Sequence, residues 1–400
     1  MGAPATIDER VRRWSVYQPW LQEDPVTPWN ELREHGPVLR SEEAGGYWIL
    51  TRYEDIEWAA RNPEIFSSAQ VGIPHRDVFP VKQIPIQLDG EEHRKWRQTL
   101  SDLFNPGVVN HFEPQIRQAA VDAIEPIVEK GRCEFITEFA TSLPAETFLI
   151  NFGIGREYLQ PLLAHKTWLR REGIPNARTD EELHAANRPL WQFFSDAIDR
   201  RRAEGTEGRM DVFSRLVEST YDGRKPTQDE MVNAAFVSML ASLDTHDRRA
   251  GHDLPLSGRA PRGAAAGPRR AGEGARDRRG AHPARARLHH RPDPHPGRGA
   301  ARRDHAQGRP RDAVVGHVGL DPDVFERPLE VDFDRSSTRQ LAFGIGPHRC
   351  LGMHVARRIV RIALEEWHTR IPSYHVTAAS IPVRHYSPAR GVARLELTIG

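Results

Sequence analysis

The sequence predicts a mainly α-helical protein with a minor β part, and three observations support this fold class. Helical spacing of apolar residues dominates residues 89–201. Two further apolar helices are expected at 231–243 and at about 350–367. Strand-like pieces are few and short, for example 47–51 and 393–397. The length of 400 residues alone permits one large domain or two to three ordinary ones.

Local signals place these elements along the chain. Prolines punctuate the first 46 residues and predict turns, and the strand at 47–51 leads into a short helix from Tyr53 to Ala60. Four prolines make residues 62–88 loop-like. Breaks in the helical region that follows are expected near Gly131, Gly153 to Gly155 and Pro175.

The middle of the chain has a different composition from the rest. A capping box, Thr227 to Glu230, opens the helix at 231–243, and helical periodicity then stops. Residues 246–313 contain no aromatic residue and only three leucines, but 17 Arg and 7 His. With 6 Asp and 1 Glu their net charge is 17 − 7 = +10, which leaves −9 for the rest of a chain of net charge +1. Because this segment cannot bury enough apolar surface to offset its ordering entropy, we expect it to be irregular or disordered as written.

Composition also bounds the cellular setting. Only two cysteines occur, Cys133 and Cys350, so a disulfide framework is not expected. The N-terminus lacks the apolar run of a signal peptide, and no stretch of some 18 apolar residues predicts a transmembrane helix. The sequence therefore predicts a soluble, cytoplasmic protein without a membrane partner.

The most specific motif is the loop from Phe343 to Gly352, which delivers one cysteine to the start of a helix. Gly344 and Gly346 permit a tight turn, and Gly352 permits the close approach of a flat ligand. Unpaired amides and the positive dipole end of a helix favour a thiolate. A buried structural cysteine after a glycine turn is the alternative interpretation of Cys350.

The spacing F-G-x-G-x-H-x-C-x-G, followed by Ala356-Arg357, resembles the haem-ligand loop of the cytochrome P-450 family of haem-thiolate monooxygenases. The resemblance implies a helical fold of that family in a single domain, 1–400, with Cys350 as the axial ligand of the iron in haem b, iron protoporphyrin IX. It also implies that His348 bonds a haem propionate and that Phe343 shields the sulfur.

Two further motifs gain meaning from the same resemblance. His93 and Arg97 lie at i, i+4 after Asp89, where the family commonly uses a His and an Arg to grip haem propionates; an exposed polar helix face is the alternative. Ala241 to Thr245 resembles the oxygen-activation signature A-G-x-D-T, in which Asp244 and Thr245 relay protons to dioxygen. A polar helix end is the alternative there, and Ser242 replaces the glycine of the family.

The family also needs an E-x-x-R helix about 70 residues before the cysteine. The literal match, Glu273 to Arg276, lacks an apolar face and is interpreted as a coincidence. Read one base later, the codons of Arg278 to Arg285 can spell Ala-Val-Glu-Leu-Thr-Arg-Leu-Val, which contains this motif with helical spacing. We therefore interpret about 246–318 as a frame-shifted segment that replaces the end of the oxygen-side helix, the E-x-x-R helix and a hairpin. The resemblance covers 1–245 and 319–400.

The resemblance implies hydroxylation of a small apolar substrate, for which a terpenoid is the interpretation we favour, with dioxygen as co-substrate. Electrons would come from NAD(P)H through a ferredoxin reductase and a ferredoxin. Four arginines near the cysteine would dock the ferredoxin, Arg349, Arg357, Arg358 and Arg361, and a solvated helix face is the alternative interpretation of these residues. The alternative is a catalytically defective relative with impaired haem binding, whose Arg-rich middle binds nucleic acid or nothing. Aromatic residues that would stack on bases are absent from 246–313, so a nucleic-acid partner is not expected.

Overall fold

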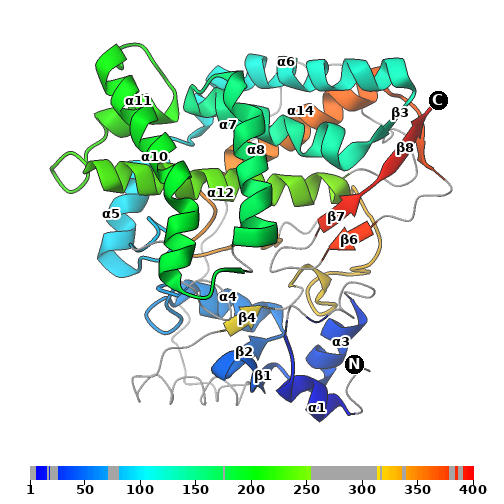
Figure 1. Ribbon diagram of the computed structural model, residues 1–400. Helices are drawn as coiled ribbons and strands as arrows, with labels where there is room; N and C mark the ends of the chain where they lie inside the picture. Colours follow the sequence, from blue (N-terminus) through cyan, green and yellow to red (C-terminus); the bar gives the residue numbers. More distant parts are fainter. Residues whose placement is uncertain are drawn as a thin grey trace, which may run out of the picture.

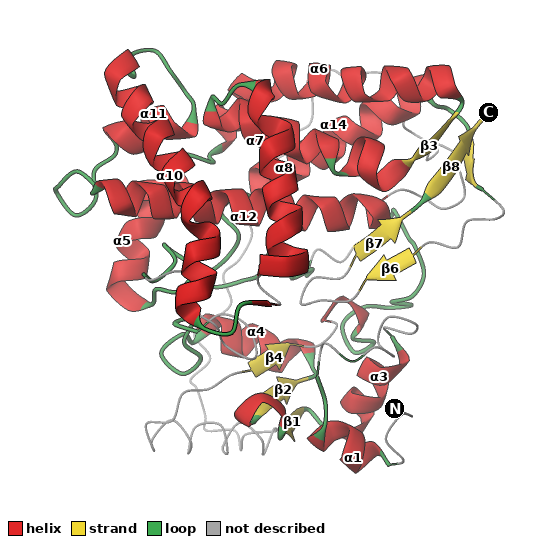
Figure 2. Ribbon diagram, viewed as in Figure 1, coloured by secondary structure: helices red, strands yellow, loops and turns green. Residues whose placement is uncertain are grey.

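The protein is described from a computed structural model in which a defined set of residues is placed. Described are residues 6–15, 18, 26–70, 81–173, 176–253, 313–315, 318–335, 339–377, 383–385 and 391–400. For residues 244–253 only the backbone is described. The mainly α fold with a minor β part is confirmed: long helices fill one half of the molecule, and a small sheet with three short helices lies beside them (Figures 1 and 2).

Helices make up most of the described chain. The short N-terminal helices are α1 (Ile7–Arg12), α3 (Thr27–His35) and α4 (Tyr53–Arg61). The larger helices are α5 (Gly90–Ser101), α6 (Pro106–Lys130), α7 (Ser142–Phe152), α8 (Leu159–Trp168), α10 (Asp180–Glu204), α11 (Val212–Glu218), α12 (Gln228–Asp253) and α14 (Met353–Arg370). Single 3₁₀ or π turns occur at η1 (Glu43–Gly45), η2 (Ile136–Ala140), η3 (Arg156–Tyr158), η4 (Leu169–Gly173) and η5 (Val318–Leu320).

Three small sheets hold the strands. In the first, β2 (Tyr47–Leu50) lies between β1 (Val38–Ser41), with which it is antiparallel, and β4 (Ala313–Val315), with which it is parallel. In the second, β8 (Glu396–Ile399) lies between β3 (Arg132–Glu134) and β5 (Tyr374–Val376). The third pairs β6 (Val383–His385) with β7 (Gly391–Arg394).

Two hydrophobic clusters hold the helical half together. In the first, buried side chains of α12 such as Phe236 pack among α5, α7, α10 and α11. In the second, the stripe Phe112, Ile116, Ala120, Ile124 on α6 faces α14, because residues four apart lie on one side of a helix. Full burial of each large apolar side chain contributes about 2 kcal/mol. α12 and α14 are therefore fixed by separate cores.

The helix that carries Asp244 and Thr245 begins as predicted but ends later. The capping box is confirmed: Glu230 N–H donates to Thr227 Oγ1 at 3.2 Å, and Thr227 N–H donates to the Glu230 carboxylate at 2.7 Å. The backbone stays helical to Asp253, eight residues into the segment that the sequence predicts to be irregular. Residues 246–253 have no apolar face that would stabilise a separate helix. They extend α12, because adding residues to a helix that has already formed is easier than starting a new one. The rest of that segment, 254–312, lies outside the described residues, as do the E-x-x-R match at 273–276 and the residues 278–285.

The strand predicted at 393–397 is wrong in one respect, because it is two strands. β7 ends at Arg394 and β8 begins at Glu396 in a different sheet. Leu395 between them is buried, donates its N–H to the Glu134 carboxylate at 2.7 Å and accepts from Phe135 N–H at 2.8 Å. These bonds take the place of ladder bonds and turn the chain from one sheet to the other.

The stretch after residue 318 docks on the N-terminal part of the chain. The buried Asp321 carboxylate accepts from Tyr53 N–H at 2.8 Å and so caps the start of α4. Tyr53 Oη donates to Arg339 O at 2.7 Å, and the Tyr53 ring meets Phe325 edge-on at 6.1 Å between centroids. α4 is therefore anchored by residues almost 270 positions later in the sequence.

Candidate functional site

The cysteine loop, residues 341–352, is a close-fitting backbone structure. Gly344 and Gly346 have φ values of +67° and +74°, in the region that glycine alone adopts without strain. A Cβ atom on Gly346 would lie 2.3 Å from Ala60 O at the end of α4, so any side chain there would clash. Cys350 N–H donates to Phe343 O at 2.8 Å and closes the loop on itself.

Cys350 is presented at the surface of the described protein. Its side chain is exposed, and its Sγ would lie 4.0 Å from a Cβ on Gly352. The helix after the loop begins at Met353 with Gly352 as its N-cap residue, three residues later than the predicted start at Cys350. Cys350 therefore lies in the turn before the helix, and a side chain at position 352 would contact the sulfur.

Two histidines and one carboxylate meet next to this loop. The His93 and His348 rings lie 4.0 Å apart between centroids at 31°. The Asp89 carboxylate at the start of α5 contacts His348 Nε2 at 3.2 Å and accepts from Ser67 Oγ at 2.6 Å and Ser68 N–H at 3.0 Å. Burial, and then the neighbouring His348 and Arg97, lower the pKa of His93 to about 4, so this ring is neutral at pH 7. Burial also lowers the pKa of His348, which Asp89 opposes.

The same cluster contains donors without acceptors. His93 Nε2 is buried and has no partner among the described residues. The half-buried Arg97 makes no ion pair with a described carboxylate; burial lowers its pKa, and the charge of a Cys350 thiolate opposes that shift. Buried cations and N–H groups are stable only when something accepts from them. A ligand with carboxylate groups beside the thiol fits this donor set, and the two propionates of haem b have this chemistry.

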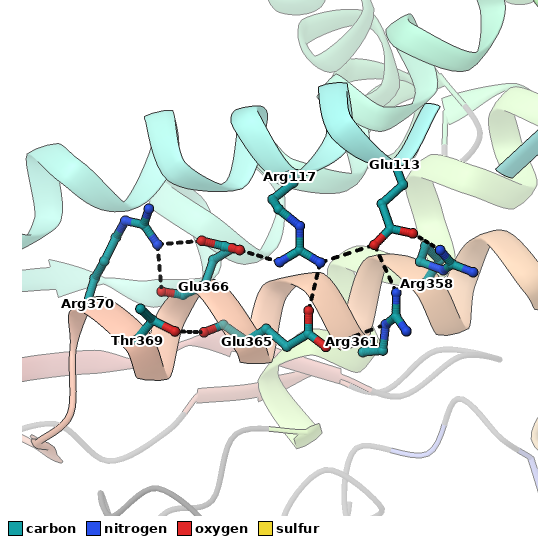
Figure 3. Close-up of polar contacts among 8 residues, drawn as sticks. All are labelled: Glu113, Arg117, Arg358, Arg361, Glu365, Glu366, Thr369 and Arg370. Atoms are coloured by element: carbon teal, nitrogen blue, oxygen red, sulfur yellow. Dashed lines mark hydrogen bonds and ion pairs between the residues drawn. The ribbon is translucent and has the colours of Figure 1, made fainter. Parts of the chain in front are cut away.

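An ion-pair network holds α14 along its whole length against α6 (Figure 3). The Glu113 carboxylate on α6 accepts from Arg117 at 3.1 Å and from Arg361 at 2.9 Å, and it also pairs with Arg358. Three further ion pairs belong to the network: Arg117 with Glu365 at 2.8 Å, Arg117 with Glu366, and Arg370 with Glu366. The network fixes the helix that follows the cysteine.

The remaining arginines near the cysteine are placed differently. Arg357 lies over the Phe343 ring, 5.3 Å from its centroid, so the predicted shield of the sulfur is itself covered by a cation. An Arg349 guanidinium nitrogen lies 3.2 Å from the Met353 sulfur. A cavity of about 230 Å³ opens between α6 and α14, lined by Pro106, Val109, His354, Arg357, Arg358 and Arg361.

The structure thus groups the predicted residues into one site with a single exception. His93, Arg97, Phe343, Gly344, His348, Cys350 and Gly352 all lie in or beside the cysteine loop. Asp244 and Thr245 lie on the backbone of α12, and their side chains lie outside the described atoms. Sequence reasoning missed the contact of Asp89 with His348 and the partners of Glu113. The only signal was the aspartate four residues before His93.

None of the described helices is long and apolar enough to cross a membrane.

Comparisons with known proteins bear on this site and fold. No family model matches the chain. The chain is 27% identical over 416 residues to "Probable cytochrome P450 127A1" of Sinorhizobium fredii, covering 97% of this chain and 94% of the relative. It is 24% identical over 429 residues to "Cytochrome P450-terp" of a Pseudomonas species, covering 94% of each. The crystal structure of CYP101J2 superimposes with a TM-score of 0.74 at 21% identity and 100% coverage of both chains.

Proposed function

Given that the chain is a bacterial-type cytochrome P450 by sequence similarity and by fold, an enzyme by family, we propose that its cysteine loop is the proximal half of a haem-thiolate monooxygenase site. One observation carries this proposal. The exposed thiol of Cys350 lies beside Arg97 and His93, two buried or half-buried donors that have no carboxylate partner among the described residues.

Each residue then has a distinct task. Haem b, when bound, supplies the iron on which dioxygen is activated. The Cys350 thiolate would bind that iron, and the absence of a side chain at Gly352 would leave the sulfur uncovered on that side. Arg97 and His93 would hold the propionates, which would accept from the unpartnered His93 Nε2 and pair with the Arg97 charge. Because His93 is neutral, it would donate a hydrogen bond without adding a buried charge.

Asp244 and Thr245 would deliver protons during oxygen activation. They follow the buried apolar turns of α12, so the helix would project an acid and an alcohol at adjacent positions. An acid and a hydroxyl in sequence can pass a proton from solvent to a reacting oxygen.

Electrons would reach the site from NAD(P)H through a ferredoxin reductase and a ferredoxin. Arg349, Arg357, Arg358 and Arg361 are the basic residues that sequence reasoning assigns to docking. Arg358 and Arg361 already pair with Glu113, so Arg349 and Arg357 carry the charge that is free to attract an acidic partner.

A small apolar terpenoid is the proposed substrate. The name of one relative, "Cytochrome P450-terp", agrees with this proposal. Val81 and Ile86 of the loop-like segment before α5 are exposed, whereas Ile84 between them is buried against α12. The segment therefore exposes Val81 and Ile86, which would be accessible to an apolar substrate, while Ile84 belongs to the core.

The chain as written would carry this site incompletely. We propose that residues 246–318 are the product of a frame shift and that the buried Glu–Arg pair of the E-x-x-R helix is missing. Both partners of this pair and the apolar face of their helix would be absent, so part of the surface that supports haem would be uncovered. We therefore expect weaker haem binding than in a chain with the frame restored.

The test is the carbon monoxide difference spectrum of the reduced, purified protein. The frame-restored chain should show the absorption band of a thiolate-ligated haem at one haem per chain, and the chain as written should show far less. Cys350→Ala in the restored chain should abolish the band, whereas Cys133→Ala should leave it. A full band from the chain as written would refute the predicted loss of haem binding, and no band from the restored chain would refute the haem-thiolate function. The frame shift itself is tested by the DNA sequence, where clean in-frame codons across 246–318 would refute it.

A further inference from the structure

A buried asparagine on α12 pairs with the backbone of the segment before α5. Asn233 Nδ2 donates to Lys82 O at 2.8 Å, and Asn233 Oδ1 accepts from Ile84 N–H at 3.0 Å. A side-chain amide offers one donor and one acceptor at the spacing of a peptide group, so Asn233 bonds residues 82 and 84 as a neighbouring strand would. An apolar side chain at this position would leave both backbone groups without these partners.

A second buried amide closes the same segment on itself. Gln87 Oε1 accepts from Gln83 N–H at 2.8 Å, and Gln87 Nε2 donates to Ala69 O at 3.2 Å. Gln83 and Gln87 are both buried. We call residues 81–88, held by Asn233 and Gln87, the clasped segment. It joins Ala69 on one side to the start of α5 on the other.

The clasped segment connects the two halves of the proposed site. It leads directly into Asp89 and α5, which carry the donors His93 and Arg97. Asn233 and Asp244 are eleven residues apart, which is three full turns of an α-helix, so both lie on the same face of α12. The clasped segment is therefore fixed to the helix face that carries Asp244, one of the two proposed proton-delivery residues.

We propose that Asn233 is a positioning residue for substrate selection: it sets the distance between the clasped segment and α12, and so the shape of the apolar surface offered to a substrate. Ile84 packs into the core beside α12, while Val81 and Ile86 stay exposed on the same segment. A shift at Lys82 and Ile84 would move both exposed side chains together. This inference rests on the proposed function for its meaning, but the clasp itself is testable without haem.

The first measurement is hydrogen–deuterium exchange of the full chain, read at residues 81–88. In Asn233→Leu the Ile84 amide loses its acceptor, and we expect exchange in the clasped segment about tenfold faster relative to the rest of the protein. Asn233→Asp keeps an oxygen for the Ile84 amide but offers no N–H to Lys82 O, so its effect should be smaller. The matched control is Asn187→Leu, because Asn187 is buried in the same helical half and donates at 2.9 Å to Leu183 O of its own helix.

The second measurement separates selection from mere stability. Equilibrium dialysis with a monocyclic C10 terpene alcohol and with 1-decanol gives the ratio of two dissociation constants for each variant. We expect Asn233→Leu to change this ratio about tenfold, Asn233→Asp to restore part of it, and Asn187→Leu to leave it unchanged.

Three outcomes would overturn the inference. Equal exchange in the clasped segment of Asn233→Leu and Asn187→Leu would show that no clasp exists. Faster exchange with an unchanged ratio, or binding of neither alcohol by the unaltered chain, would remove the role in selection. Failure of the proposed function is read separately, from the carbon monoxide spectrum.

Discussion

The two cysteines lie near opposite ends of α14, and their environments differ. At the start of the helix Cys350 lies exposed in a loop that is fixed by glycine backbone, by ring contacts and by the Glu113 network. At the far end Trp367 and Ile371 pack with Phe135 and Phe139 in the second hydrophobic cluster, and Cys133 on β3 is buried among them.

The comparison distinguishes a cysteine that contributes to packing from one that is accessible to a ligand. Burial, with Glu138, Glu134 and Glu396 nearby, raises the pKa of Cys133 to about 12, so this residue remains a thiol and serves as a small apolar side chain. Cys350 contributes little to the core, yet the chain uses two left-handed glycines to place it. A thiol that is held in position without being buried is available to a ligand.

The largest expected effect is in thiol reactivity. In the native protein Cys350 should react with a small disulfide reagent, and Cys133 should react at least about a thousandfold more slowly, because a pKa about three units above normal leaves that much less thiolate at pH 8. The measurement is the number of thiols titrated per chain before and after denaturation. One should react in the native protein and two in the denatured protein; two fast thiols in the native protein would contradict the burial of Cys133.

The second effect concerns the fit of the cysteine loop. Gly346→Ala adds a Cβ that meets Ala60 O at 2.3 Å, whereas Gly344→Ala has a similar positive φ but no backbone atom nearer than 3.9 Å. The left-handed conformation costs an alanine about 1–2 kcal/mol at either position. The clash at Gly346 should cost about 1–3 kcal/mol more. Urea denaturation measures the unfolding free energy of both variants. Equal losses would show that the loop at Gly346 does not pack tightly against the end of α4.

The smallest effect lies in the ion pairs between α6 and α14. Glu113→Gln leaves Arg358, Arg361 and Arg117 with fewer acceptors, and we expect a loss of about 1 kcal/mol in unfolding free energy because all of these groups are partly exposed. The loss should shrink in about 1 M salt, where the screening length falls to about 3 Å. Glu125→Gln, an exposed glutamate on the same helix, is the control and should change stability by less than about 0.5 kcal/mol.

Local patterns were sufficient to predict much of the fold. The capping box at Thr227, the strand at Tyr47 and the amphipathic helix after Cys350 depend on neighbours within a few residues, and each forms close to the predicted position. The residues of the proximal site were predicted from a motif whose spacing is local as well. Helix ends were less accurate: α12 extends to Asp253, and α14 begins at Met353.

Long-range contacts were not predictable from one sequence. The Asn233 amide bonds residues about 150 positions earlier, and Glu113 pairs with arginines about 250 positions later. Leu395 leaves its strand because of Glu134, which no periodicity near Leu395 indicates. In each case the partner is chosen by the packing of two elements, and a polar residue on a helix gives no local sign of what it will face.

The capping of α4 by Asp321 has a consequence for the connectivity of the molecule. The last eighty residues hold the first part of the chain through Asp321 and Tyr53, through His348 and Asp89, and through the arginines that meet Glu113. None of these contacts uses residues 254–312. Two separate polypeptides, one ending after α12 and the other starting at Ala313, would keep these contacts and the pairing of β4 with β2. We therefore expect the two pieces to associate when they are expressed together.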